Sequence, residues 1–130
     1  MADVEERVFD QLSTATGLAA LVSSRVYPTE LPQNATLPAV TYVRHSTDRD
    51  HAMGSDPGNV HALFRVTYWH SVYFSAIAGI DEVRAALSRY SVTTGSTVVE
   101  DCFLSGERHG IDPERAAYST SLDFHVHYRE

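Results

Sequence analysis

Residues 17–42 read GLAALVSSRVYPTELPQNATLPAVTY, and this stretch decides how the chain is organised. The apolar residues at its start predict a short helix that begins at Gly17. Pro28, Pro32 and Pro38 follow within eleven residues. None of them can lie inside a helix, because each lacks an amide proton and clashes with the preceding turn. Each also biases the residue before it towards extended geometry. We therefore expect a rigid, extended strap that leads from the short helix into a strand.

The segments around this strap predict an α+β fold with the chain order helix, helix, strand, strand, helix, strand, strand. Periodicity places helices over 2–13 and 73–90, with the short helix between them, and strands over 39–45, 60–70, 97–104 and 118–128. Residues 46–59 are rich in Asp, Asn, Gly and Pro and are expected to form a loop, and 107–114 a polar turn. We expect a mainly antiparallel sheet of about four strands, with the long helix and the N-terminal helix packed on one face.

The last expected strand has the clearest alternation in the chain. Its apolar face carries Leu122, Phe124, Val126 and Tyr128. Its polar face carries Ser121, Asp123, His125, His127 and Arg129. The long helix has an apolar stripe of helical period, made of Phe74, Ile77, Ile80, Val83, Leu87 and Tyr90. Gly79 lies inside this helix, where glycine costs about 1 kcal/mol relative to alanine, so another element is expected to pack closely there.

Composition is that of one soluble globular domain over residues 1–130, with 43% hydrophobic and 21% charged residues. No apolar run approaches the roughly 20 residues that cross a bilayer, so no membrane association is expected. The single cysteine, Cys102, lies in an apolar run beside Glu100 and Asp101. These carboxylates would raise the pKa of its thiol, and we expect a buried structural cysteine and a reducing compartment.

The charge of the chain argues against a nucleic-acid binding protein. Its formal net charge is −7, and all ten basic residues are arginines that occur singly along the chain. A protein that grips phosphates over a broad surface needs clustered basic residues, because its affinity comes from the release of counterions. The sequence contains no such cluster, so broad nucleic-acid binding is excluded.

Several segments together resemble the tail-completion or tail-terminator proteins of long-tailed bacteriophages and gene transfer agents. They are Arg25-Val26-Tyr27-Pro28, the strand segment 37–42, Arg65-Val66-Thr67-Tyr68-Trp69, the helix segment 80–87 and the ending 118–128. The resemblance covers about residues 4–129 in the same order. It leaves out the acidic segment 47–59, which matches no pattern of the family.

The resemblance implies a structural protein that forms a hexameric ring, caps the tail tube and joins the tail to the head connector. No catalytic, cofactor or metal site is implied. Its partners would be other copies of itself, the tail tube protein and the head-completion or connector protein, in the neck of the virion, after synthesis in the host cytoplasm. Genomic DNA would pass through the lumen without specific binding, because six chains of charge −7 sum to about −42 and repel phosphates.

A closed ring needs two unlike contact patches on each subunit, and the sequence suggests a candidate for each. One candidate is the polar face of the last strand, with His125, His127 and Arg129. The other is the polar loop, which would reach a neighbouring subunit or the tube. Its candidate contact residues are Asp48, Arg49, Asp50, His51, Met53 and Asp56.

The same polar strand face also permits a metal site. His125 and His127 stand two residues apart with Asp123 before them, a spacing that zinc can use. A closed zinc site needs four ligands, and no second pair occurs at motif spacing. The loop comes close to a calcium-binding pattern but has Asn59 where the pattern requires glutamate.

Two other functional classes therefore stay open beside the ring-forming structural protein. One is a head-completion or connector adaptor from the same neck region, a small α+β binding module. The other is a metal-assisted hydrolase that uses His125 and His127. Nucleophilic catalysis has less support, since no serine lies in a Gly-x-Ser-x-Gly segment.

Overall fold

The structure is a computed structural model of the chain, and it describes residues 4–23, 25–34, 36–49, 59–92, 98–113 and 116–129. Its helices are α1 (Val4–Thr14), α2 (Thr16–Val22) and α3 (Tyr73–Leu87). Its strands are β1 (Val26–Pro28), β2 (Ala39–Arg49), β3 (Asn59–His70), β4 (Val98–Asp112) and β5 (Ala117–Arg129). The predicted α+β class is confirmed, and the predicted element order is matched apart from the additional strand β1.

The five strands form one mixed sheet in the order β1-β2-β3-β5-β4. The pairs β2–β3, β3–β5 and β5–β4 are antiparallel, whereas β1 runs parallel to β2. The prediction of about four mainly antiparallel strands was therefore one strand short. The missing strand lies in the proline-rich strap, where Val26–Pro28 pairs with Val40–Tyr42. Pro28 is compatible with this position because β1 is an edge strand, and an edge leaves one side of the backbone unpaired.

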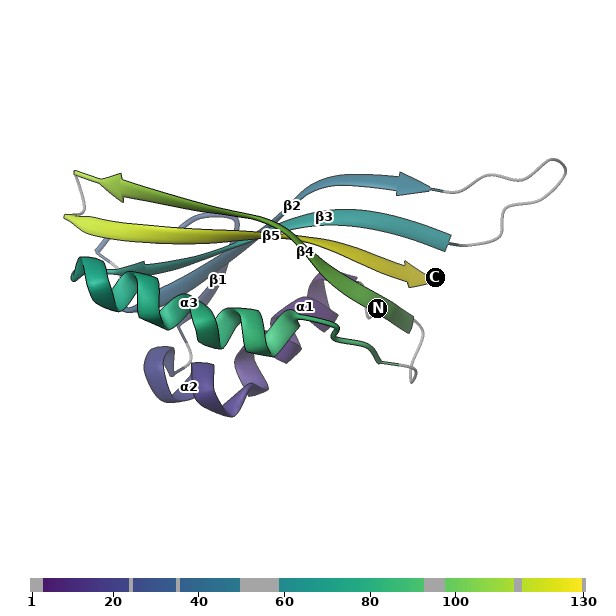
Figure 1. Cartoon of the computed structure of the whole chain (residues 1–130), viewed down its shortest axis with the longest axis horizontal. Coiled ribbons are helices and arrows are strands. Elements are labelled where there is room, and N and C mark those ends of the chain that lie inside the picture. Colours follow the sequence, from purple (N-terminus) through teal and green to yellow (C-terminus); the bar gives the residue numbers. More distant parts are fainter. Residues whose placement is uncertain are drawn as a thin grey trace, which may run out of the picture.

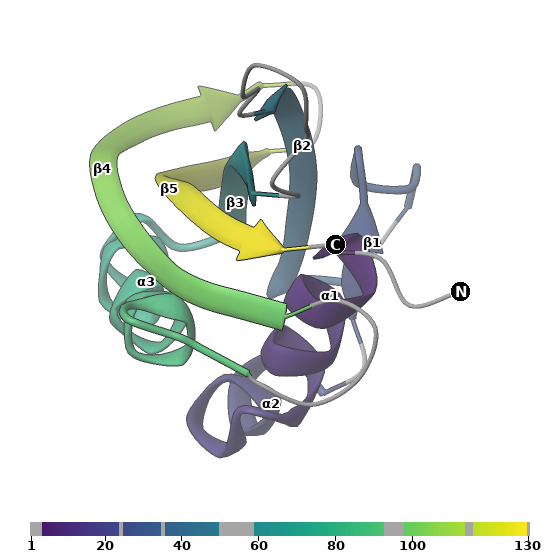
Figure 2. The ribbon, with the colours of Figure 1, turned by 90° about the vertical axis from the view of Figure 1, so that its right-hand side faces the viewer.

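All three helices lie on one side of the sheet, as predicted (Figure 1). The core forms between the helices and the covered face of the sheet, and β4 curves round it (Figure 2). The apolar face of β5 is buried in full, since Leu122, Phe124, Val126 and Tyr128 are at most 1% exposed. They pack in one cluster with Leu12 and Leu18 of the first two helices and with Ile80, Val83 and Leu87 of α3. Within the described ranges, no helix is long and apolar enough to cross a membrane.

Two polar segments that were predicted as loop or turn belong to strands. β2 continues to Arg49 beyond a bulge between Arg44 and Ser46, so the expectation of a loop from residue 46 was wrong. β4 continues to Asp112, so the expected turn was wrong over 107–112, whereas Pro113 does lie in a turn. In both cases the backbone pairs with a neighbouring strand, and this pairing outweighs a polar composition that is typical of turns. Residues 50–58 of the predicted loop lie outside the described ranges.

Helix α3 lies close to the sheet at Gly79, as its position in the helix predicted. A Cβ atom at Gly79 would collide with Cε2 and Cζ of the Tyr68 ring and would lie 2.7 Å from its hydroxyl oxygen. Glycine is therefore required for the contact between α3 and β3. The predicted apolar stripe was wrong at its first member, because Phe74 is 78% exposed and lies outside the core.

Candidate functional site

The sheet face turned away from the helices carries the polar residues of β5. Burial alternates along this strand from Thr120 onward as predicted, with His125 exposed between the buried Phe124 and Val126, and Arg129 exposed after the buried Tyr128. Arg65 of β3 lies opposite Asp123 in the strand register, and their side chains form an ion pair at 2.9 Å. Next to it, the hydroxyls of Thr67 and Ser121 are 2.9 Å apart. These pairs cross from β3 to β5 and hold the two strands in register.

A row of four titratable residues crosses this open face near the C-terminal end of β5. The strand register aligns Asp48 with His61, His61 with His127, and His127 with Asp101. The rings of His61 and His127 meet edge to face, with 4.3 Å between their centroids. Burial lowers the pKa of His127, and the charges of His61 and His125 lower it further. His127 is therefore neutral at neutral pH.

The candidate interface residues thus lie together at one end of the sheet. Asp48 and Arg49, predicted in a loop, are the last residues of β2. β2 and β3 extend past the helices at this end, where β5 also finishes (Figure 1). His125, His127 and Arg129 lie on this last part of β5. Asp50, His51, Met53 and Asp56 lie outside the described ranges. We call the surface formed by Asp48, Arg49, His125, His127 and Arg129 the polar end.

The arrangement around His125 and His127 differs from the metal site that their spacing permits. Asp123, which would supply the third metal ligand beside these two histidines, forms an ion pair with Arg65 instead. Among the residues described by the structure, no group of three or more His, Cys, Asp or Glu side chains could hold a metal ion. The described part of the polar end therefore offers charge and hydrogen-bonding groups for contact with another molecule.

Cys102 is a buried structural thiol, as predicted. Its side chain is buried on the covered face of β4. Burial, with a smaller contribution from the charge of Asp101, raises the pKa of the thiol to about 12. The thiolate is the nucleophilic form of cysteine, so Cys102 is unreactive at neutral pH.

A second exposed surface, at the opposite end of the sheet, was not predicted. It is apolar and consists of Val72, Tyr73, Phe74, Ile111 and Tyr118, which we call the aromatic end. The start of α3, the end of β4 and the start of β5 meet there (Figure 1). The Tyr73 ring packs edge to face against both Phe74 and Tyr118, with centroid distances of 5.4 and 5.5 Å. A sequence signal existed: three large apolar residues in succession, Val72 to Phe74, cannot all face the core from one helix end.

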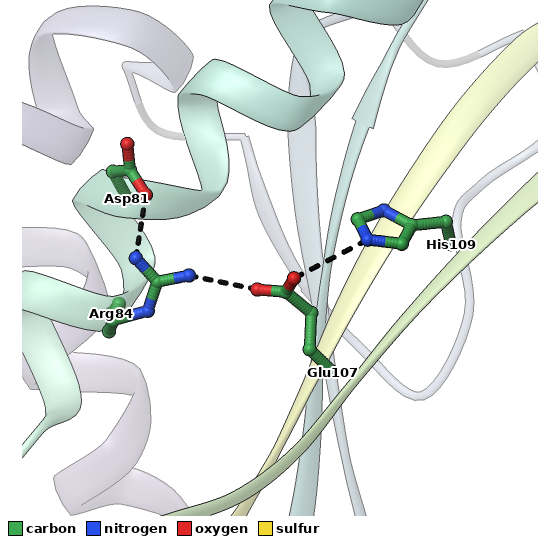
Figure 3. Close-up of polar contacts among 4 residues, drawn as sticks. All are labelled: Asp81, Arg84, Glu107 and His109. Atoms are coloured by element: carbon green, nitrogen blue, oxygen red, sulfur yellow. Dashed lines mark hydrogen bonds and ion pairs between the residues drawn. The ribbon is translucent and has the colours of Figure 1, made fainter.

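A chain of charged side chains joins α3 to the last part of β4 (Figure 3). Arg84 donates to Asp81 at 2.6 Å and to Glu107 at 2.8 Å. His109 lies 3.4 Å from the other carboxylate oxygen of Glu107. The hydrogen bond to Asp81 is the main reason that the pKa of Arg84 is raised. Glu107 points from β4 towards α3 (Figure 3), so this ion pair links the helix to the strand.

Comparison with known proteins gives two findings. Residues 6–129 match the model of a protein family described as "Tail completion protein gp17". Among solved structures, a chain of the "Virion of native gene transfer agent (GTA) particle" has the same fold, with a TM-score of 0.69 and 19% sequence identity. The match covers 95% of this chain and 92% of that one. A comparison with curated proteins finds no match.

The family match spans nearly all of the chain and includes every segment on which the resemblance rests, from residues 25–28 to the ending 118–128. The resemblance seen in the sequence is thereby confirmed. The chain belongs to the tail-completion family, and it is a structural protein of the virion tail and not an enzyme.

Proposed function

We propose that this chain, as a single-domain subunit, forms a hexameric ring that caps the tail tube and joins the tail to the head connector. The observation that carries the proposal is the presence of two chemically unlike exposed surfaces at opposite ends of one sheet, in a protein of the tail-completion family. The polar end is charged and rich in histidine. The aromatic end is apolar.

Two unlike surfaces suit a capping ring because one can contact a neighbouring subunit while the other meets the tube or the connector. Within the ring, each subunit contacts its two neighbours head to tail through different patches. Such head-to-tail contacts form a ring when their rotation closes, and they form a filament when it does not. A ring with one face complementary to the tube would stop further addition of tube subunits. Its other face would then provide a new docking surface for the connector.

We assign the contact with the tube or the connector to the polar end. Asp48, Arg49, His125, His127 and Arg129 supply both signs of charge and several hydrogen-bonding groups at the end where β2 and β3 project. The neighbouring candidates Asp50, His51, Met53 and Asp56 would extend this contact. Electrostatic complementarity at such a surface favours the correct partner over others.

The acidic balance of the chain supports passage of DNA without binding. Six chains of charge −7 carry about −42 in total, and a narrow channel concentrates such a field. An electrostatic potential map of the assembled ring would test this point. An unpaired belt of arginines that lines the channel would contradict it.

The ring is tested by measuring mass and shape of the purified protein and by examining particles that lack it. A hexamer of 14.4 kDa chains has a mass of about 86 kDa, and sedimentation distinguishes it readily from a monomer. Negative-stain images should show six-fold rings, and particles without the protein should have tails of uncontrolled length that fail to join heads. A monomer both in solution and in isolated virions would refute the ring. If such a monomer bound the connector, it would be an adaptor instead.

A further inference from the structure

We propose that the aromatic end is the surface through which one subunit docks against a second copy of the chain. The inference rests on the proposed ring and names the surface that holds its subunits together. The polar end remains free for the tube or the connector.

The aromatic end exposes far more apolar side chain than scattered surface residues do. Phe74 is 78% exposed, Ile111 61%, Val72 51% and Tyr73 46%. Isolated exposed apolar residues are normal, whereas a contiguous group of large ones marks a site of interaction. These four lie together with Tyr118 where α3 and β5 begin and β4 ends.

Side chains of the aromatic end already pack against one another in the single subunit. Ile111 and Tyr118 are direct neighbours in the β4–β5 register. The ring of Tyr73 makes edge-to-face contacts with both Phe74 and Tyr118. A patch that is already ordered loses little conformational entropy on binding. Aromatic side chains of this kind are the residues that carry most of the binding energy in protein interfaces.

Polar residues near this patch form the rim that such interfaces have. Arg84 is bound to both Asp81 and Glu107, and His109 lies beside Glu107 (Figure 3). The charge of Arg84 offsets one of the two carboxylate charges. An apolar centre with a polar, accessible rim is the usual anatomy of a protein–protein contact.

The distribution of charge on the chain favours a second copy of the chain as the molecule that binds the aromatic end. Each chain carries −7, so two copies repel each other at long range. They can come together most readily through a surface that is locally close to neutral. The aromatic end contains no Asp, Glu, Lys, Arg or His side chain, and Arg84 beyond it is paired with Asp81 and Glu107. The polar end, in contrast, carries unlike charges that suit a partner of different composition.

The test compares Phe74→Asp with Leu21→Asp, which changes another exposed apolar helix residue, 39% exposed, outside the aromatic end. Both positions are accessible, so circular dichroism and thermal unfolding should show folded protein in each case. We expect Phe74→Asp to weaken subunit association by roughly thirtyfold or more, the effect of removing an aromatic anchor. Leu21→Asp should leave the ring intact, and Phe74→Leu should retain most of the association.

A second measurement uses a new cysteine at the aromatic end. Because Cys102 is buried and its thiol has a raised pKa, Ile111→Cys introduces the one thiol that maleimide reaches in the folded protein. The new thiol should be labelled rapidly in dilute monomer and be protected in rings that contain no tube protein. Equal labelling in both states would overturn the proposal.

The outcomes separate this inference from the proposed ring. If the wild-type protein forms no ring in solution or on tails, the proposed function itself fails. If the ring forms and Phe74→Asp leaves it intact but abolishes binding to purified tails, the aromatic end contacts the tube and the second-copy proposal is wrong. If Phe74→Asp and Leu21→Asp disrupt the ring equally, the effect is not specific to the aromatic end and the proposal is rejected.

Discussion

The close approach of α3 to the sheet makes Gly79→Ala a sharp test of the fold. An alanine Cβ at this position would overlap the ring of Tyr68 and reach within 2.7 Å of its hydroxyl oxygen. Tyr68 is only 1% exposed, so its ring cannot move aside into solvent. Either the ring or the helix must therefore shift.

Two opposing effects set the size of the change. Replacing a glycine inside a helix by alanine stabilises the helix by about 1 kcal/mol. Overpacking a well-filled core costs roughly 1–3 kcal/mol, and the upper part of that range applies here because the overlap involves ring carbons as well as the hydroxyl. We expect Gly79→Ala to lower the free energy of unfolding by roughly 2 kcal/mol, and Tm by roughly 6–10 °C.

The matched control is Gly17→Ala in helix α2. A Cβ atom at Gly17 would meet the carboxylate end of Glu82, which is flexible and can move away. Gly17→Ala should therefore be neutral or stabilise the protein by up to about 1 kcal/mol. The same chemical change is thus expected to act in opposite directions at the two sites.

Chemical denaturation of both variants, at a concentration where all share one association state, gives the free energies of unfolding. In a Tyr68→Leu background, Gly79→Ala should lose most of its cost, because the ring that it meets is gone. If Gly79→Ala stabilised the wild-type protein as much as Gly17→Ala does, the close packing of α3 on β3 would be refuted.

Three further predictions concern single side chains. Arg65→Ala and Asp123→Ala should each destabilise the protein by up to about 1 kcal/mol, and the exchange Arg65→Asp/Asp123→Arg should recover part of the loss in denaturation experiments. The pKa of Cys102 is raised to about 12, so its thiol should react with iodoacetamide at pH 8 only on unfolding; rapid labelling of native protein would contradict its burial. The pKa of His127 is lowered in the folded protein, mainly by burial, so the unfolded chain binds a proton more readily than the folded chain does. The contribution of neutral His127 to the free energy of unfolding is therefore complete above about pH 6.5 and is lost as the pH falls below that value. Unfolding midpoints at pH 7.5 and 5.5 should differ less in His127→Gln than in the wild type.

Elements with a strong local period could be predicted from the sequence. The burial of β5 alternates from Thr120 to Arg129 as expected, because successive side chains of a strand point to opposite sides. The position of Gly79 inside a helix predicted that another element packs closely against it, but the sequence did not predict that the neighbour is Tyr68. The strap was correctly predicted to be extended at Val26–Pro28 and to contain no helix, since proline restricts the backbone wherever it occurs; its residues 29–30, 33–34 and 37–38 form bends and a turn.

Features that depend on long-range pairing could not be predicted in this way. The proline pattern predicts an extended backbone but not the strand with which it pairs, so the parallel pairing of β1 with β2 was missed. Ser46–Arg49 and Glu107–Asp112 have the composition of turns, but their backbone groups are paired by β3 and β5. Phe74 fits the helical period of the core stripe and still lies outside the core, with 78% of its surface exposed.

The same distinction between local sequence order and long-range packing applies to the candidate surfaces. The sequence by itself determined that His125, His127 and Arg129 share one strand face, that the chain is acidic, and that its segments resemble a tail-completion family, since these depend on local order and composition alone. Only the tertiary structure decided that Asp48 and His127 lie in one cross-strand row and that Phe74, Ile111 and Tyr118 gather at the opposite end. These residues are far apart in the chain, and they are brought together by strand register and helix placement, which are set by the packing of the whole core.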